Sequence, residues 1–294
     1  MDLPAPMIKK LKAYLSLIKP TIILLVVFTG ATALVLEGSL SSKPALFLTI
    51  LVLLFLSAGS ANGLNQYLER ERDAKMARTR SRRPLPLGQL TPKEALAFSL
   101  VIGLISVVTF AVVFNWLSAA LTLATIVFYS TFYTLYLKPR TPYNIVIGGA
   151  AGAMGPLIGW AAVTGTLSWT PWILFAIIFF WTPPHFWALA ICLEDDYRKA
   201  KLPMMPNVIG EARTWQKMSV YLYVTFILSL VLFLNNAGWI YLSGAVISGG
   251  FFLYQFNRGR RIMKKPETWK VFGYSIAYLL MLFTFMIIDK GFGG

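Results

Sequence analysis

The sequence predicts an all-α, polytopic membrane protein with nine transmembrane helices. Hydrophobic residues make up 57% of the 294-residue chain, charged residues make up only 13%, and the mean hydropathy is +0.65. A soluble domain usually has about a quarter of its residues charged. Nine apolar stretches are long enough to cross a bilayer, where helices satisfy their own backbone hydrogen bonds.

The expected spans are separated by short polar or basic segments. They are centred on residues 21–37, 44–64, 94–113, 116–137, 143–163, 171–192, 217–235, 238–256 and 271–288. Nothing is left over for a soluble domain, so residues 1–294 are expected to form a single integral-membrane domain. The lysine-bearing segment 1–20 could suggest a signal peptide, but eight further spans and a poor cleavage context favour a retained anchor.

Basic residues orient the chain in the membrane. Of the 27 Lys and Arg residues, only Lys43 and Lys290 fall on one side of the expected bilayer. The positive-inside rule therefore places segments 1–20, 65–93 and 193–216 in the cytoplasm and the carboxyl terminus outside. The net charge of +15 reflects topology and attraction to anionic lipids, and it does not indicate nucleic-acid binding. The lack of an Arg- and Ser-rich presequence favours a prokaryotic plasma (inner) membrane.

The most informative stretch is NQYLERERDAKMARTRSRRPLPLG, residues 65–88. If the helix of the second span continues, Asn65, Glu69 and Asp73 share one face, a spacing suited to oxygen ligands around Mg²⁺. Four arginines that could hold phosphate oxygens follow, Arg78, Arg80, Arg82 and Arg83. The stretch therefore suggests a diphosphate site built on magnesium bridges. The alternative is a solvated loop whose arginines only fix the membrane orientation.

A second acidic cluster ends the sixth span. It consists of Glu194, Asp195 and Asp196. Four spans separate this cluster from Asp73, so both acidic helix ends open on the same side of the membrane. Two such half-sites could close around one polyanionic ligand. The alternative is that the cluster only pairs with Arg198 and Lys199.

The chain between the half-sites offers further candidates. Lys138 and Arg140 end the fourth span and could reach a phosphate group held by metal ions, although on their own they are ordinary loop charges. The fifth span is rich in Gly and Ala, which permits close helix packing or leaves room for a bulky apolar ligand. Pro156 loosens this helix.

The single histidine, His185, lies within the sixth span, just after Pro183 and Pro184, which should kink the helix. A histidine inside the membrane could bind haem iron, act as a base, or only hydrogen-bond a neighbouring group. Cys192 is the only cysteine, which excludes an intramolecular disulfide and a cysteine-based metal cluster.

Three segments together resemble the UbiA superfamily of membrane prenyltransferases, and most closely its haem O synthase (protohaem IX farnesyltransferase) branch. They are NQYLERERDAKMARTRSRRPLPLG, YTLYLKPRTPYNIVIGGAAGAMGPLIGWAAVTG and TPPHFWALAICLEDDYRKAKLPMMP. The first segment resembles the whole superfamily, and the second and third resemble the haem branch in particular. The likeness extends over nearly the whole chain.

The resemblance implies nine helices around a central cavity, with segments 65–93 and 193–216 as cytoplasmic active-site loops. It implies that Mg²⁺ and a prenyl diphosphate are held by Asn65, Glu69, Asp73, Asp195 and Asp196. Cys192 stands where quinone-type members have an acid, which departs from a symmetric two-metal site. One extra arginine before Pro84 leaves open whether Arg82 or Arg83 faces the phosphates.

The reaction implied is the transfer of a farnesyl group from farnesyl diphosphate to a vinyl group of haem b, with addition of water, giving haem O and diphosphate. Magnesium would offset the charge on the leaving diphosphate. That charge would be shared by Arg78, Arg82 or Arg83, Lys138 and Arg140. Aromatic side chains such as Tyr133, Trp181 and Phe186 could stabilise the allylic cation. His185 would then have an iron atom to bind, and a haem A synthase is the expected recipient of the product.

Two other functions fit parts of the sequence. The first is a UbiA-type enzyme that prenylates a quinone or a tetrapyrrole precursor, and the haem-type second and third segments argue against it. The second is a membrane transporter. Apart from His185, however, no ionisable side chain is expected in mid-membrane, whereas a proton- or ion-coupled pathway usually needs several.

Overall fold

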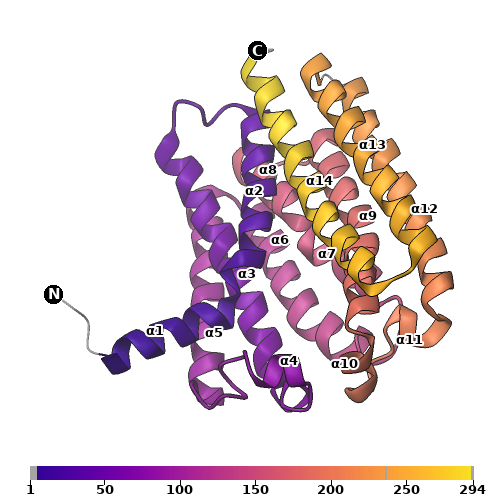
Figure 1. The fold of residues 1–294 in the computed structure, drawn as a ribbon. Coiled ribbons are helices and arrows are strands. Elements are labelled where there is room, and N and C mark those ends of the chain that lie inside the picture. Colours follow the sequence, from indigo (N-terminus) through magenta and orange to yellow (C-terminus); the bar gives the residue numbers. More distant parts are fainter. Residues whose placement is uncertain (1–4, 236, 293–294) are drawn as a thin grey trace.

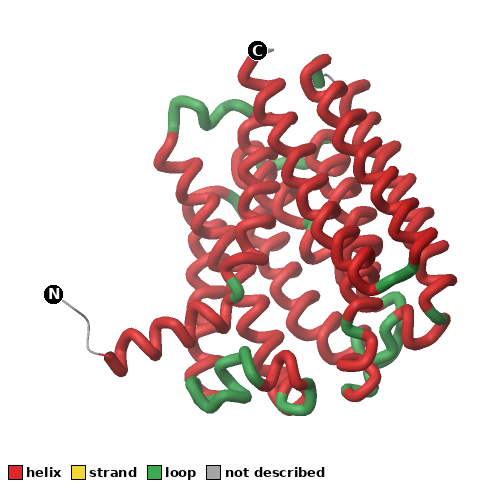
Figure 2. Tube along the Cα trace, in the orientation of Figure 1, coloured by secondary structure: helices red, strands yellow, loops and turns green. Residues whose placement is uncertain are grey.

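A computed structural model describes residues 5–235 and 237–292 of the chain. Within these ranges every regular element is a helix, and the connections are short (Figure 2). Long helices lie side by side, while α1 projects away from them across one end of the bundle (Figure 1).

The elements are α1 (Ala5–Ile18), α2 (Pro20–Glu37), α3 (Pro44–Asp73), α4 (Ala77–Arg80), α5 (Pro92–Thr109), the π-helix η1 (Phe110–Phe114), α6 (Trp116–Val127), the π-helix η2 (Phe128–Leu137), α7 (Asn144–Gly152), α8 (Met154–Thr164), α9 (Trp169–Cys192), α10 (Glu194–Lys199), α11 (Met205–Ile209), α12 (Glu211–Val231), the 3₁₀ helix η3 (Leu232–Asn235), α13 (Trp239–Ile262) and α14 (Lys265–Phe292).

The predicted spans are confirmed as helical segments. In the described part of the chain, eight segments are both long and apolar enough to cross a membrane. The ninth is α13, whose 24 residues are long enough but include several Gly, Ser and Arg residues that lower its mean hydropathy. It lies beside α12 and α14 (Figure 1). The chain is therefore a multi-pass integral membrane protein.

Local sequence explains where several helices begin. Proline occupies the first position of α2, α3 and α5, where its missing N–H removes no helical hydrogen bond. Thr91 and Glu94 form a capping box at the start of α5. At the start of α13, the Asp289 carboxylate accepts hydrogen bonds from the backbone N–H groups of Gly238 (2.5 Å) and Tyr241 (3.1 Å). Asp289 thus joins the last helix to α13.

The side chains separate into an interior and a lipid-facing surface. Leu100, Leu104 and Val108, at helical spacing on α5, are all exposed. Trp187 and Trp215 are among the largest fully buried side chains. Exposed apolar stripes on long helices are the surface that a bilayer covers.

The two segments expected as active-site loops contain more helix than a loop would. Helix α3 continues to Asp73, so its 30 residues extend for about 45 Å, beyond the roughly 30 Å of a hydrocarbon core. Segment 193–216 contains α10, α11 and the first six residues of α12. We call the end of the bundle formed by segments 65–93, 193–216 and 258–270 the basic end.

Helix α1 is fixed to the basic end by α3. The side-chain amide of Gln66 donates to the carbonyl oxygen of Leu17 (2.6 Å), and that of Asn62 donates to the carbonyl oxygen of Ile18 (3.1 Å). The outward face of α1 exposes four apolar side chains, Met7, Ile8, Leu11 and Leu15. Such an amphipathic helix suits the membrane–water interface.

Small residues set the distance between α3 and α5. A Cβ atom on Gly63 would lie 2.1 Å from the Ser99 hydroxyl, and one on Gly103 would lie 2.4 Å from the Ser60 hydroxyl. Only glycine allows this approach, which holds the end of α3 in place against α5.

Candidate functional site

The last turns of α3 bring Asn65, Glu69 and Asp73 into the interior of the basic end. The structure confirms that the helix continues through all three, and none is more than 2% exposed. Buried carboxylates require cationic partners. Lys138 Nζ lies 2.5 Å from Glu69 Oε1, and the Arg83 guanidinium pairs with Asp73 and lies 3.7 Å from Glu69 Oε2.

The loop after α3 selects which arginine faces the acids. The Thr79 hydroxyl donates to the backbone carbonyl oxygen of Asp73 (2.7 Å), which folds the loop back onto the end of the helix. Arg82 is exposed, whereas Arg83 is only partly exposed and turns inward. Of the two arginines left open by the sequence, Arg83 is therefore the one beside the acids.

The π-helix η2 lies against the same face of α3. The Asn65 side-chain amide donates to the Thr134 hydroxyl (2.9 Å), which in turn donates to the carbonyl oxygen of Tyr129 (2.8 Å). The rings of Tyr129 and Tyr133 are stacked, with centroids 5.3 Å apart. π-Helical segments are frequent at functional sites. Here η2 supplies Thr134, two tyrosines and, at its end, Lys138.

Lys19 is a cation of this site that the sequence did not reveal. It connects α1 to α2 in a left-handed conformation, with φ of 58°, and its side chain is partly buried. Burial, and then the neighbouring Arg83 cation, lower the pKa of Lys19 from 10.5 to about 7. The Lys-Pro pair marks a helix boundary in the sequence, but proximity to Glu69 and Lys138 arises only from tertiary packing.

The acidic pair has the chemistry of a site for a hard cation. Glu69 Oε2 and Asp73 Oδ1 are buried and have no hydrogen-bond partner. Carboxylate oxygens of this kind are preferred Mg²⁺ ligands. In residues 5–235 and 237–292, no group of three or more His, Cys, Asp or Glu side chains is arranged to hold a metal ion. A magnesium ion here would therefore need oxygens from a bound anion or water to complete its coordination.

The second acidic cluster lies on α10. Glu194 pairs with Arg198, so the alternative suggested by the sequence holds for this residue. Asp195 is exposed and Asp196 is partly exposed. In the described chain neither aspartate forms an ion pair. Their carboxylates are free to meet a ligand.

Tyr197 on α10 is a partly buried tyrosine that is affected by charges of the acidic stretch 65–88. Burial raises the pKa of the Tyr197 hydroxyl, and the charges of Arg78 and Glu69 act on the same group. This tyrosine also was not predicted from the sequence. It is a residue of α10 on which charges of the first acidic stretch act.

The remaining predicted phosphate ligands form no ion pair with Glu69 or Asp73 in the described chain. The Arg140 guanidinium donates to the carbonyl oxygens of Leu135 (2.9 Å) and Tyr136 (3.2 Å) and lies 4.6 Å from the centre of the Tyr136 ring. Arg78 and Arg80 are exposed at the rim of the loop. The structure therefore brings Lys138, but not Arg140, to the acids.

His185 lies on α9, is enclosed within the bundle and faces α14. Its Nδ1 atom lies 2.7 Å from the Ser275 hydroxyl. Its ring is stacked between Trp181 and Phe272, with centroid distances of 4.4 Å and 4.5 Å. Helix α9 continues through both prolines before it. The hydrogen bond engages Nδ1 and leaves Nε2 as the nitrogen that a metal could approach.

The Glu69–Lys138 pair is expected to dominate local stability. Replacing Lys138 by Met should lower the free energy of unfolding by about 3 kcal/mol, because it leaves a buried carboxylate without its cation. Adding Glu69→Gln should recover at least about 1 kcal/mol of this loss. The coupling energy of the pair follows from a double-mutant cycle. It requires the free energies of unfolding, in detergent and without ligand, of the wild type, both single variants and the double variant.

The pair Glu267–Lys270 is the control for this cycle, because its side chains are 19% and 53% exposed, whereas those of Glu69 and Lys138 are 2% and 12% exposed. Its coupling should stay below about 1 kcal/mol. Equal coupling energies for the two pairs would contradict the burial argument.

The lowered pKa of Lys19 predicts a pH dependence. Between about pH 7 and 10.5 the unfolded chain binds a proton that the folded chain does not, so the free energy of unfolding should rise with pH in this window. Lys19→Met removes this proton and should flatten that part of the rise. Unfolding of both ligand-free proteins across this range tests the difference, and superimposable pH curves would refute it.

Comparison with known proteins places this chain in a family. Residues 24–285 match the UbiA prenyltransferase family. A protoheme IX farnesyltransferase of Clavibacter michiganensis is 46% identical over 285 residues, which cover 96% of this chain and 93% of the relative. One from Synechocystis is 45% identical over 283 residues, which cover 95% and 89%.

Solved structures share the fold. A digeranylgeranylglyceryl phosphate synthase superposes with a TM-score of 0.79 at 20% identity, covering 96% of this chain and 98% of the other. A UbiA homolog from Archaeoglobus fulgidus, bound to DMAPP and Mg²⁺, superposes with a TM-score of 0.66 at 16% identity, covering 92% and 99%. From the family match and the identity to its full-length relatives, the chain belongs to the UbiA prenyltransferase family.

Proposed function

We propose that the chain transfers a farnesyl group from farnesyl diphosphate to a vinyl group of haem b, with addition of water, giving haem O and diphosphate. The observation that carries the proposal is the buried Glu69–Asp73 pair, which has two oxygens without a hydrogen-bond partner and is flanked by Arg83 and Lys138. The protoheme IX farnesyltransferase relatives support haem b as the acceptor.

The diphosphate would occupy the space beside these acids. Mg²⁺ would be held by Glu69, Asp73 and the Asn65 amide, with Asp195 and Asp196 of α10 closing the other side. When bound, the metal supplies charge that stabilises the leaving diphosphate. The Mg²⁺ and DMAPP held by the Archaeoglobus fulgidus homolog support a metal-dependent site of this type.

Three cations of the chain would share the diphosphate charge. Arg83 and Lys138 already lie at the acids, and Lys19 lies near them without an ion pair in the described residues. A guanidinium can hold two phosphate oxygens at once, whereas an ammonium acts as a point charge. Arg78 would reach the phosphates from the rim, and Arg82 and Arg140 would first have to turn towards them.

The allylic carbon would lie next to η2. Tyr129 and Tyr133 present stacked π-systems beside Thr134, where an aromatic face can stabilise a carbocation. A Cβ atom on Gly148 would lie 2.3 Å from the Tyr133 ring, so the Gly-rich start of the fifth span is what lets this ring lie close to α7. Trp181 and Phe186 lie farther along α9, around His185.

The proposal extends to the membrane in which the protein lies and to its partners. The proposed membrane is a prokaryotic plasma membrane, and the charge distribution favours an orientation with the basic end in the cytoplasm and the carboxyl terminus outside. Haem b, farnesyl diphosphate and the bilayer are the partners that the reaction requires. A haem A synthase would receive the product.

An activity assay tests the reaction and both acidic motifs. Purified protein with haem b, farnesyl diphosphate and Mg²⁺ should form haem O, detected by mass, and Asp73→Asn and Asp196→Asn should each lower turnover at least about 100-fold. Glu267→Gln, which changes a partly exposed acid of the basic end outside the site, is the control and should retain activity.

Other outcomes of this assay would favour the other functions. If the protein prenylates a quinone-ring acceptor and forms no haem O, it is a prenyltransferase of this fold, but haem b is not its acceptor. If no diphosphate is released with any acceptor, the transporter interpretation returns.

His185 is proposed as the haem iron ligand, through Nε2. His185→Ala should remove the shift of the haem absorption band that binding produces and lower haem affinity at least about tenfold. Ser275→Ala, which removes only the hydrogen-bond partner of the ring, should keep most of the spectral shift. If the His185→Ala protein shows the wild-type spectrum and turnover, the histidine has a packing role only.

A further inference from the structure

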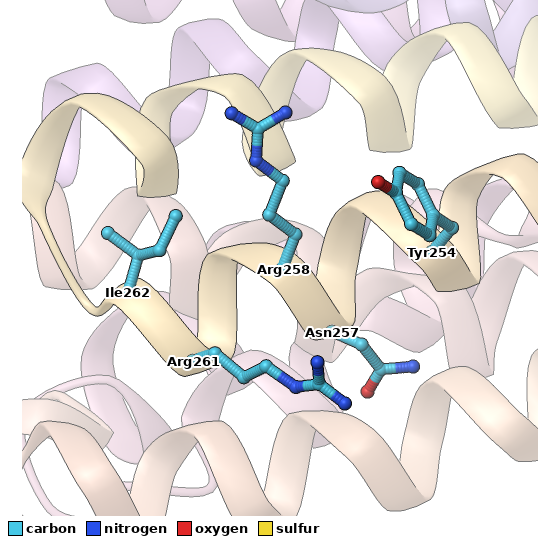
Figure 3. A pocket seen from close by; sticks show the side chains of 5 residues that line it. All are labelled: Tyr254, Asn257, Arg258, Arg261 and Ile262. Atoms are coloured by element: carbon cyan, nitrogen blue, oxygen red, sulfur yellow. The ribbon is translucent and has the colours of Figure 1, made fainter.

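A pocket on α13 lies outside the site described above. Its volume is about 410 Å³, and it is lined by Tyr254, Asn257, Arg258, Arg261 and Ile262 (Figure 3). All five residues belong to the last turns of one membrane-spanning helix. None of them contacts the acids of α3 or α10 through an ion pair or a hydrogen bond in the described chain. The pocket therefore needs an explanation of its own.

The position of α13 in the bilayer places this pocket at the headgroup level. The helix begins at Trp239, which is 74% exposed, as expected of an aromatic residue at the membrane interface. Arg258 follows nineteen residues later, which corresponds to about 29 Å of helix. A hydrocarbon core is about 30 Å thick. Trp239 and Arg258 thus lie at the two interfaces, with the pocket at the second.

Along one face of α13, apolar side chains are followed by a tyrosine and then by two arginines. Ile247 and Phe251 are exposed in the membrane-spanning part, Tyr254 follows and is 64% exposed, and Arg258 and Arg261 come next. The steps of three or four residues keep all five on one helical face. Hydrocarbon, an aromatic ring with a hydroxyl, and then two cations match the acyl chain, glycerol region and phosphate of a phospholipid.

Packing on the opposite face fixes the direction of these arginines. Phe256 is buried, and a Cβ atom on Gly259 would lie only 2.6 Å from Val271 of α14. Arg260 donates a hydrogen bond to the Ser219 hydroxyl of α12 (3.0 Å). The helix end therefore cannot rotate freely, and the side chains at positions 258 and 261 stay on the outer surface.

The charges of the two pocket arginines, Arg258 and Arg261, are not neutralised by an ion pair in the described chain. Both are exposed, and neither forms an ion pair or a hydrogen bond within residues 237–292 or with the rest of the described chain. Glu267, the acid in the first turn of α14, pairs with Lys270 (2.6 Å). Lys270, and more weakly Arg258, lower the pKa of the Glu267 carboxyl, so Arg258 is near this acid without an ion pair to it. Two guanidinium groups without ion pairs at headgroup depth favour a ligand with a phosphate group.

We propose that this pocket binds an anionic phospholipid, with the headgroup phosphate on Arg258 and Arg261 and an acyl chain along Phe251 and Ile247. A basic pocket at the membrane surface is the recognised chemistry for such a headgroup. The site is independent of the prenyl-transfer reaction, because no residue that holds the diphosphate or haem takes part in it.

Native mass spectrometry of the delipidated full-length protein tests the proposal. Wild type titrated with phosphatidylglycerol should bind one molecule at least about tenfold more tightly than phosphatidylcholine with the same acyl chains. R258A/R261A should lose this preference, and R258K/R261K, which keeps the charges, should retain part of it. If the R258A/R261A protein retains the wild-type preference, the pocket is not the site.

Two controls separate this pocket from general surface charge and from free phosphate. K9A/K12A removes two exposed cations of α1, away from the pocket, and should leave the preference unchanged. An equal loss would mean that the pocket has no special role. Millimolar inorganic phosphate should not displace the lipid, since it lacks acyl chains, and displacement would overturn the lipid assignment. The unfolding midpoint of each variant in lipid-free detergent verifies that the fold is intact.

Discussion

The carboxylates of Glu69 and Asp73 are buried at the end of α3, where an unpaired charge would cost several kcal/mol. Lys138 and Arg83 compensate them, but these cations come from two other parts of the chain. Pairing therefore requires η2 to lie against α3 and the loop after α4 to fold back over it. The arrangement of the basic end follows from this requirement for charge balance.

The same charge balance suits the proposed substrate. A magnesium-bound diphosphate brings cations for the carboxylates and anions for Arg83 and Lys138, so the partners can be exchanged without leaving a buried charge uncompensated. Lys19 is different, because its lowered pKa keeps a large fraction of it neutral near pH 7. An arriving anion would favour its charged form and so add one more positive charge to the site.

Helical periodicity explains why part of this site is readable from sequence. The positions of Asn65, Glu69 and Asp73 on one face depend only on the helix continuing, and the spans follow from hydropathy, including the less apolar α13. The choice of Arg83 over Arg82 depends on how Thr79 folds the loop, and Arg140 is held by the carbonyls of its own turn. Lys19 reaches the acids through packing between helices distant in sequence, which no local pattern records.

Helix α1 contributes no side chain to the acidic pair, yet its last carbonyl groups are held by Asn62 and Gln66, within one turn of Asn65 and Glu69. Its outer face is apolar and suits the membrane surface. A position of α1 at that surface would fix the depth of the acids, together with the spans. A polar diphosphate and its apolar tail need this depth to match, so α1 would then align the site with the lipid boundary.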